Sequence, residues 1–305
     1  MISQKDHSSP HGGLSARDRI VRSLCLLFLV SGVGILALTI VYLFIESGFG
    51  EGFLHRILDC FTGEWRPLAT PPKLGMAHAW VSTAMVTGIA LAISFPIGIG
   101  IGLFTSEIAP LIIRRLLTPA LELLAGIPAV VYGFFGAVTL VRWFENAFQL
   151  SSGETLLGAG IVLSVMMLPF IASTSGEAFR AVFREYRESV LSLGVDQFTM
   201  LRRVILVRAF PGLIAAAALG LARGLGETLA VLMLSGNTTA FPESVLSRGQ
   251  PITALLATEI GETAVGSDKY HMLFTGALFL MLLVLLLNLA ISVLKRKIYT
   301  GLYAN

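Results

Sequence analysis

Six long apolar stretches constrain what this chain can fold into more than any other feature. Each approaches or exceeds the roughly 20 residues that an α-helix needs to cross a bilayer. A chain in lipid must satisfy its own backbone hydrogen bonds, so stretches this long and apolar predict helices. The sequence therefore predicts an all-α polytopic membrane protein. Its six predicted transmembrane helices lie at about 21–45, 78–105, 119–141, 156–174, 208–235 and 271–294.

The composition agrees with a membrane protein and offers a simple explanation for the positive charge. Charged residues make up 13% of the chain, against about 25% in soluble domains. The net charge of +3 fits the cytoplasmic Lys and Arg of membrane proteins, and no nucleic-acid-binding motif is present. Cys25 lies inside the first apolar run and Cys60 in the following loop, so no structural disulfide is expected.

The distribution of Lys and Arg predicts the orientation. With both termini in the cytoplasm, 15 of the 22 Lys and Arg residues fall in inner segments, six in outer loops and one, Arg223, within a helix. This bias follows the positive-inside rule. The apolar run after Arg22 is too long for a signal peptide and lacks an A-x-A site, so we expect it to stay as a spanning helix. The predicted organisation is an N-terminal tail over 1–20, a transmembrane domain over 21–296 and a C-terminal tail over 297–305.

The cytoplasmic segment 176–207 has the spacing of an amphipathic helix. Gly194 ends this helix, and Phe198 begins a second, shorter one. The segment could dock into the groove of a partner protein or lie on lipid headgroups. Its apolar positions are Phe179, Val182, Phe183, Tyr186, Val190 and Leu193, and its charged positions are Arg180, Arg184, Arg187 and Glu188.

Two ionisable residues lie within the fifth predicted helix. Arg223 and Glu227 are four residues apart, so on one helix they share a face. An ionisable side chain at the centre of a bilayer costs at least about 2.5–3.5 kcal/mol. The two could form a structural ion pair with a neighbouring helix, or Arg223 could receive a passing anion while Glu227 positions and screens it. The planar guanidinium suits oxyanions. Gly220 and Gly224 flank Arg223 and allow close helix packing.

Prolines and glycines mark two further helices. Pro96, with Gly98 and Gly102 close behind it, indicates a helix that flexes or packs tightly, and packing is the favoured interpretation. Pro128 and Gly126 predict a kink or local break early in the third helix, as transporters have near binding sites. Glu122, near the cytoplasmic end of that helix, is expected at the membrane interface.

The cytoplasmic segment also resembles a known motif. Glu188-Ser-Val-x-x-x-Gly194, nine further residues and Val204-x-Leu206 are similar to the EAA loop of ABC-importer permeases. This resemblance implies a coupling helix seated in a cleft of an ATPase subunit, with Arg184, Arg187, Glu188, Gly194 and Phe198 as the coupling residues. Val207 stands where the motif usually has proline, so the local bend can differ.

Three more motifs resemble the phosphate ABC permease family, in particular its PstC branch. They are Gly126-Ile-Pro-Ala-Val-Val-Tyr-Gly-Phe-Phe-Gly136, Ala222-Arg-Gly-Leu-Gly-Glu-Thr-Leu-Ala-Val231, and Glu259-Ile-Gly-Glu with Tyr270-His-Met-Leu-Phe274. The resemblance covers residues 74–296. It implies a type I importer fold in a bacterial inner membrane and a role for Arg223 and Glu227 in translocation. It also implies three kinds of partner: a second homologous permease, two ATPase subunits that bind ATP and Mg²⁺, and an external phosphate-binding protein.

No enzyme motif is present. The chain lacks G-x-x-x-x-G-K-[ST], so we expect it to bind neither ATP nor any other cofactor or metal and to leave ATP hydrolysis to its partners. Three alternatives stay open: a permease for sulfate, molybdate or another oxyanion; an ion-coupled transporter with Glu227 as proton carrier; and a membrane scaffold that senses phosphate. The missing second half of an inverted repeat argues against the ion-coupled transporter.

Overall fold

The computed structural model describes residues 16–48, 50 and 52–303, with side chains described over 20–48, 50 and 52–293. Most of the predicted N-terminal tail and the last two residues therefore lie outside the described residues. The elements, in chain order, are α1 (Ala16–Glu46), α2 (Phe53–Phe61), β1 (Trp65–Arg66), β2 (Lys73–Leu74), α3 (Ala77–Leu103), the π-helix η1 (Phe104–Ile108), α4 (Leu111–Gly126), α5 (Ala129–Phe135), the π-helix η2 (Gly136–Leu140), α6 (Val141–Phe148), α7 (Leu156–Ser192), α8 (Gln197–Met200), the π-helix η3 (Leu201–Ile205), α9 (Leu206–Leu225), α10 (Leu229–Leu232), α11 (Ile252–Glu259), the 3₁₀ helix η4 (Ile260–Glu262) and α12 (Asp268–Tyr303).

Within the described residues, five helices are long and apolar enough to cross a membrane, or six if one bent pair counts as a single span. The predicted all-α membrane fold is therefore confirmed. The fourth predicted span, 156–174, is only the first half of α7, which continues without a break to Ser192, inside the segment 176–207. The fifth begins earlier than predicted, at Gln197, and ends at Leu225 rather than 235. Arginines at its start hid the helix from a search for apolar runs.

The third predicted span, 119–141, is wrong as a single helix. Leu111–Gly126 and Ala129–Phe148 form a pair bent by 91°. Pro128 precedes α5, and Ile127 before it is extended, because the proline ring disfavours helical geometry in the preceding residue. A kink or break at Gly126 and Pro128 is what the sequence predicts, although a bend this large is not.

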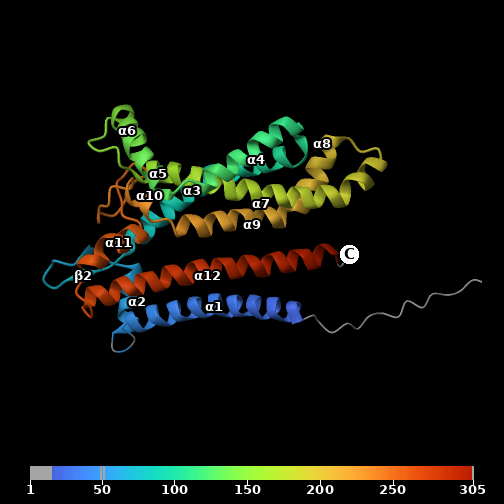
Figure 1. Ribbon diagram of the computed structural model, residues 1–305. Helices are drawn as coiled ribbons and strands as arrows, with labels where there is room; N and C mark the ends of the chain where they lie inside the picture. Colours follow the sequence, from blue (N-terminus) through green and yellow to red (C-terminus); the bar gives the residue numbers. More distant parts are fainter. Residues whose placement is uncertain (1–15, 49, 51, 304–305) are drawn as a thin grey trace, which may run out of the picture.

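The helices run between two ends of the molecule (Figure 1). The described ends of α1 and α12 lie at the same end as α4 and α8, which we call the α8 end. The hairpin β1–β2, α2, α6 and α11 gather at the opposite end, which we call the α11 end. The short helix α2 lies between α1 and α3 at this end. The described ends of α1 and α12 thus share a side, as the predicted orientation requires.

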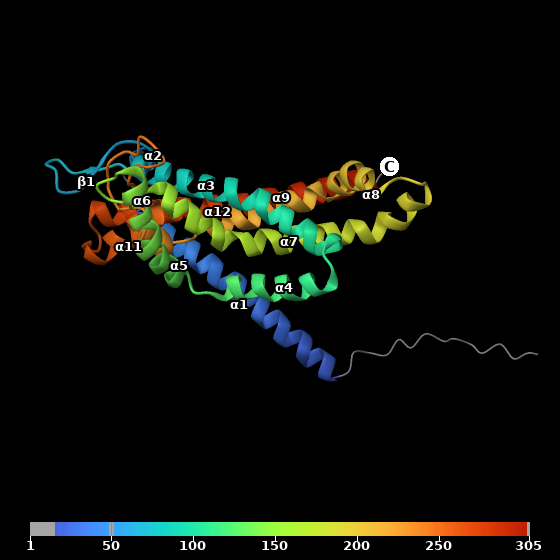
Figure 2. The same cartoon turned by 90° about the horizontal axis from the view of Figure 1, so that it is seen from above.

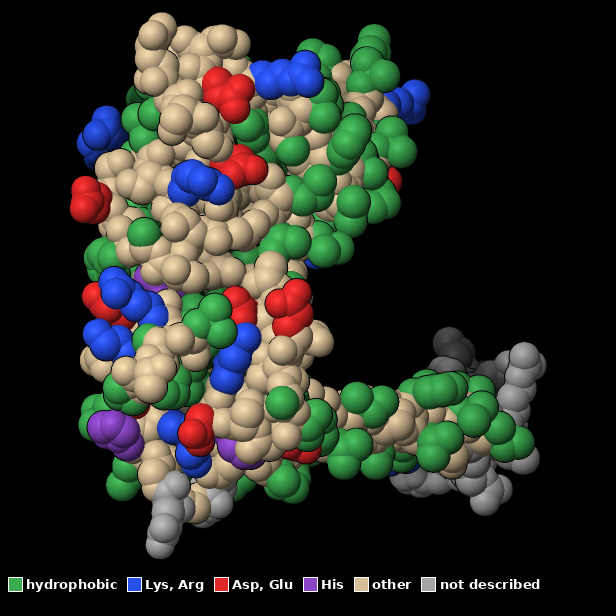
Figure 3. Space-filling model, turned by 90° about the vertical axis from the view of Figure 1, so that its left-hand side faces the viewer, with side chains coloured by type: hydrophobic (Ala, Val, Ile, Leu, Met, Phe, Trp, Pro, Cys, Tyr) green, Lys and Arg blue, Asp and Glu red, His purple; other side chains and the backbone are tan. Residues whose placement is uncertain are grey.

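The helix α1 stands apart from the rest of the bundle. It diverges from the other helices in Figure 2 and forms an arm covered with hydrophobic side chains in Figure 3. Its membrane-spanning window has no buried residue, and its main neighbour is α12. An exposed apolar surface of this kind suits contact with lipid or with another membrane subunit.

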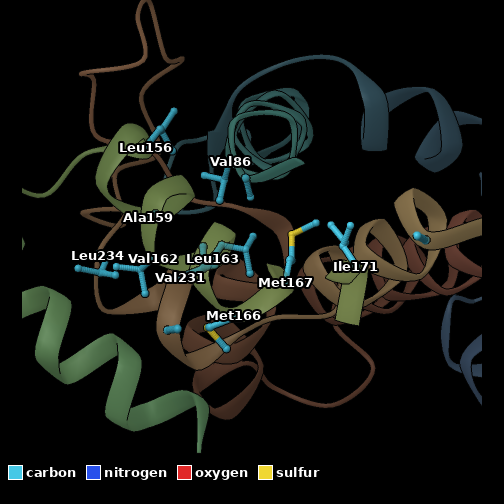
Figure 4. Close-up of a cluster of buried hydrophobic side chains, with 13 residues drawn as sticks. Val86, Leu156, Ala159, Val162, Leu163, Met166, Met167, Ile171, Val231 and Leu234 are labelled. Atoms are coloured by element: carbon cyan, nitrogen blue, oxygen red, sulfur yellow. The ribbon is translucent and has the colours of Figure 1, made fainter. Parts of the chain in front are cut away.

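The core lies where α7 packs between α3 and α9, with α10 at one end (Figure 4). Its buried side chains are Val86, Ala90, Leu156, Ala159, Val162, Leu163, Met166, Met167, Ile171, Ala216, Ala230, Val231 and Leu234. Helix association in lipid depends on close packing because lipid tails are as apolar as the side chains. Small residues on α3 and α9 supply that close approach.

Glycines bring α3 against α7. A Cβ on Gly98 would lie 2.7 Å from Ile171 Cγ2, and one on Gly102 would lie 2.8 Å from the Ala172 carbonyl oxygen. Ser175 of α7 also donates a hydrogen bond to the Gly98 carbonyl at 3.3 Å. Pro96 lies inside α3, which continues past it to Leu103. The structure therefore shows the tight packing that the sequence favours for this stretch.

Candidate functional site

Arg223 lies in the last turn of α9. The carbonyl groups at a helix C-terminus carry partial negative charge and stabilise a cation there. Its guanidinium carbon lies 4.5 Å from the centre of the Phe170 ring of α7, close enough for a cation–π interaction. Its side chain is exposed in the isolated chain, and no ion pair involves it among the described residues. Among the described residues, no carboxylate therefore neutralises its charge.

Glu227 does not share a helix face with Arg223, which corrects the sequence-based expectation. The helix α9 ends at Leu225, and Glu227 lies in the link to α10. Its carboxylate accepts a hydrogen bond from the Ala230 N–H at 3.4 Å, so it satisfies a donor at the start of α10. Within the described part of the chain Glu227 forms no ion pair, and the predicted structural ion pair is absent.

The link between α9 and α10 is fixed from both sides. The N–H of Glu227 donates to the Gly224 carbonyl at 3.2 Å, and the Thr253 hydroxyl of α11 donates to the Glu227 carbonyl at 2.9 Å. Gly224 packs on α7, where an added Cβ would lie 3.0 Å from Met167 Sδ. These hydrogen bonds and this packing fix the break between α9 and α10, so Arg223 lies at the end of α9.

Gly220 also packs on α7, as its small-residue spacing predicts. An added Cβ there would lie 2.8 Å from Ile171 Cδ1. Because Gly98 of α3 faces the same isoleucine, Ile171 is enclosed between α3 and α9. The three helices therefore meet directly beside Phe170 and Arg223.

The break between α4 and α5 lies close to Arg223. The Tyr132 hydroxyl of α5 donates to the Leu124 carbonyl of α4 at 2.8 Å, which links the two arms of the bend. The Tyr132 side chain is within electrostatic reach of Arg223. The bend thus brings the Tyr132 hydroxyl against the end of α4.

The end of α7 and the start of α8 form an exposed turn. Gly194 has a φ of +72°, a left-handed conformation that glycine adopts without strain. Asp196 then caps α8, accepting a hydrogen bond from the Thr199 N–H at 3.0 Å. The hydrogen bond from Thr199 holds the pKa of the Asp196 carboxyl below its usual value. Gly194 and the second short helix thus lie where the sequence predicts them.

One face of this turn is anchored and the other is free. Phe179 and Phe183 of α7 are buried with Met200, Ile205, Ala209 and Leu213. At the tip, Leu193 is 79% exposed and Phe198 is 69% exposed. Exposed apolar side chains on a helical turn suit contact with a partner.

The predicted coupling residues have different surroundings. Arg187 is ion-paired with Glu107 of η1 at 3.0 Å, so it joins the turn to the end of α3. Arg184 and Glu188 are exposed. Arg208 of α9 lies over the Tyr186 ring of α7, 5.4 Å from its centre, which joins the two helices behind the turn.

Sequence reasoning missed three residues of the site. Phe170 lies in an apolar stretch, and neither Phe170 nor Thr253 belongs to a sequence pattern that indicates a functional residue. Tyr132 falls inside a motif that the sequence analysis quotes, but its contacts depend on the bend. All three owe their roles to tertiary contacts.

Comparison with known proteins identifies relatives over most of the chain. The family described as "Binding-protein-dependent transport system inner membrane component" matches residues 98–300. The "Probable ABC transporter permease protein YqgH" of Bacillus subtilis is 37% identical and aligned over 76% of this chain and 75% of its own length. The "Phosphate transport system permease protein PstC" of Haemophilus influenzae is 31% identical, over 79% and 80%.

Solved structures share the fold at lower identity. A bacterial alginate ABC transporter in complex with an alginate-bound periplasmic protein aligns with a TM-score of 0.61 and 15% identity, covering 92% of this chain and 96% of that one. The MetNI methionine ABC transporter in an inward-facing conformation aligns with a TM-score of 0.53 and 20% identity, covering 72% and 94%. At these identities the likeness concerns the fold alone.

Proposed function

This chain belongs to the family of binding-protein-dependent transport system inner membrane components, and on that premise we propose that it carries inorganic phosphate inward as a subunit of an ATP-driven importer. Relatives named as phosphate transport permeases support the choice of substrate. The observation that carries the proposal is the position of Arg223 at a helix end against Phe170, where its guanidinium forms no ion pair with any described residue. Arginine binds oxyanions through its planar fork of N–H donors.

The same two helices connect this arginine to the exposed turn. The helix α7 runs unbroken for 37 residues, a length of about 55 Å at 1.5 Å per residue. It carries Phe170 and ends at Ser192, two residues before Gly194. The continuous helix Gln197–Leu225 carries Phe198 and Arg223. A displacement of the turn therefore moves both partners of the Arg223–Phe170 contact.

The ATPase subunits are the proposed occupants of the turn. Leu193 and Phe198 supply apolar contacts, and Arg184 and Glu188 supply polar ones at its rim. ATP and Mg²⁺ bind to those subunits in this mechanism. Their closure on ATP pulls the turn, and the helices rock so that Arg223 faces one side of the membrane and then the other.

Two other partners complete the proposed importer. A second, homologous permease covers the exposed apolar face of α4 and α5, which includes Ile112, Leu116, Leu123, Val131, Phe134 and Phe135. An external phosphate-binding protein docks at the α11 end, where positive and negative side chains both lie on the face in view (Figure 3). In the proposed importer the chain lies in a bacterial inner membrane, with the described ends of α1 and α12 toward the cytoplasm.

Uptake of labelled phosphate by cells with and without this chain tests the proposal. Deletion should abolish high-affinity uptake, re-expression should restore it, and excess sulfate or molybdate should not compete. Uptake should also stop when the ATPase subunits carry a variant that cannot hydrolyse ATP. Unchanged phosphate uptake after deletion, with other phosphate systems removed, would overturn the substrate. Uptake that persists without ATP hydrolysis would indicate an ion-coupled transporter. Phosphate-dependent regulation that persists without uptake would indicate a membrane scaffold.

A further inference from the structure

A pocket of about 300 Å³ opens between α4 and α7, beside η1. At roughly 30 Å³ for each water in the liquid, this volume equals about ten waters, enough for an oxyanion with part of its hydration shell. Its polar lining comes from both helices. Thr118 and Glu122 belong to α4, while Ser173, Thr174 and Arg180 belong to α7.

These five polar side chains are uncommitted. Across the described part of the chain, Glu122 and Arg180 form no ion pair, and the hydroxyls of Thr118, Ser173 and Thr174 make no hydrogen bond. Nearby, Arg187 is paired with Glu107. Thr118, Glu122, Ser173 and Arg180 are exposed and Thr174 is half-buried, so the hydrogen-bonding groups of all five side chains are accessible to a ligand that enters this cavity.

The pocket lies next to the Arg223 site and on its α8 side. Phe170 lines the pocket at one end and carries Arg223 on its ring. Arg180 lies ten residues further along α7, about 15 Å away at 1.5 Å per residue. Its guanidinium folds back along the helix, with Nη1 only 3.5 Å from where a Cβ on Gly176 would sit. Arg180 therefore lines the pocket directly, and Arg223 contacts the pocket through the ring of Phe170.

We propose that this pocket is a second oxyanion site, which receives the substrate after Arg223 and admits only oxyanions that still carry a proton. The inference rests on the proposed function. Arg180 and the three hydroxyls donate to the oxyanion. The Glu122 carboxylate can only accept, so it favours an anion with a P–OH donor and repels one without. Near neutral pH, inorganic phosphate keeps at least one proton and sulfate keeps none.

Phosphate binding to the whole purified complex in nanodiscs, without the external binding protein, tests the site. All variants are made on an Arg223→Gln background so that Arg223 does not contribute. Adding Arg180→Gln should weaken binding of labelled inorganic phosphate at least about tenfold, as expected for loss of hydrogen bonds to a charged group. Adding Glu122→Gln should keep phosphate binding and allow sulfate to compete, because the amide donates where the carboxylate could not.

Matched controls are Arg142→Gln in α6 and Glu243→Gln in the outer loop, which lie outside the pocket and should change neither property. Co-purification of all subunits verifies assembly. If Arg180→Gln leaves the affinity for phosphate unchanged, the proposed site is overturned. If sulfate still does not compete with phosphate in Glu122→Gln, the proposed selection mechanism is overturned.

A lipid headgroup is the other source of a phosphate-like anion. Lipid phosphodiesters lack the P–OH donor, so anionic lipid should not displace labelled phosphate from the pocket. Displacement by anionic lipid would instead identify a lipid site. If wild-type cells fail to take up phosphate, the proposed function is overturned. If wild-type cells take up phosphate normally and the Arg180 and Glu122 variants bind anions as their background does, only this inference is overturned.

Discussion

The guanidinium of Arg223 lies over the ring of Phe170, with 4.5 Å between the guanidinium carbon and the ring centre. Phe170 belongs to α7 and Arg223 to the continuous helix Gln197–Leu225, and these two helices flank the exposed turn at Gly194. The ring contacts the flat face of the guanidinium, and the N–H donors at the edge of the guanidinium stay available for an oxyanion. Positioning and binding are therefore separable by mutation.

Phe170→Leu should slow phosphate uptake while leaving assembly unchanged. The cation–π contact is worth about 0.5–2 kcal/mol, so we expect a fall of about two- to thirtyfold in initial rate. Phe170→Tyr keeps the ring and should keep most of the rate. Phe210→Leu is the matched control, since Phe210 is an exposed phenylalanine of α9. A Phe170→Leu rate equal to that control would show that the ring does not position Arg223.

Two neighbouring glycines of α3 should respond in opposite ways to alanine. Gly102→Ala pushes a methyl group against the Ala172 carbonyl and Ser175 of α7 and should destabilise the protein by about 1–3 kcal/mol. Gly100 faces open space, so Gly100→Ala should be neutral or stabilise by up to about 1 kcal/mol through helix propensity. Thermal unfolding of the two variants in detergent measures the difference. Equal melting temperatures would contradict the α3–α7 packing.

Gly194→Val should uncouple the chain from ATP hydrolysis. Nothing lies within 4 Å of the added Cβ, but the φ of +72° disfavours a β-branched residue, and the turn should change shape at a cost of about 1–3 kcal/mol. We expect reduced retention of the ATPase subunits and lower ATP-driven uptake. Gly266→Val is the matched control, because Gly266 has a φ of +79° and equal free space in the outer loop. The same loss in both variants would assign the effect to general instability.

Asp196 should make the start of α8 sensitive to acid. Its pKa is lowered in the folded state by the Thr199 hydrogen bond. A lowered pKa means that the stabilisation is complete above the ordinary Asp value of about 3.9 and is lost as the pH falls through the folded value. The protection of residues 197–205 against hydrogen exchange, measured relative to the intrinsic exchange rate at each pH, should therefore fall at low pH. In Asp196→Ala exchange should already be fast at neutral pH, and slow exchange in that variant would contradict the cap.

Much of the fold could be predicted because lipid imposes a simple rule on the sequence. Long apolar runs become helices, and Gly194 ended the amphipathic segment where its lack of a side chain suggested. The prediction of helix boundaries was wrong where charged residues or a proline interrupted the apolar pattern. Arginines at 202, 203 and 208 concealed the continuation of α9 toward α8, and Pro128 produced a 91° bend that apolarity does not encode.

The candidate site was predicted by residue type but not by geometry. Arg223 was identifiable because an arginine in an apolar run needs a reason. Its spacing from Glu227 suggested a shared helix face, yet the helix ends between them at Leu225. That end depends on Gly224 against Met167 and on Thr253 bonding the Glu227 carbonyl, contacts between residues far apart in the sequence. No local pattern contains them.

The most direct measurement is ATP-dependent phosphate uptake by the whole complex reconstituted in proteoliposomes, comparing the wild type with Arg223→Gln. Arg142→Gln serves as the control for removal of a positive charge. We predict that Arg223→Gln abolishes uptake of labelled phosphate although all subunits still co-purify and Arg142→Gln transports normally. Uptake by the assembled Arg223→Gln complex at the wild-type rate would contradict the role of Arg223 in carrying the anion across the membrane.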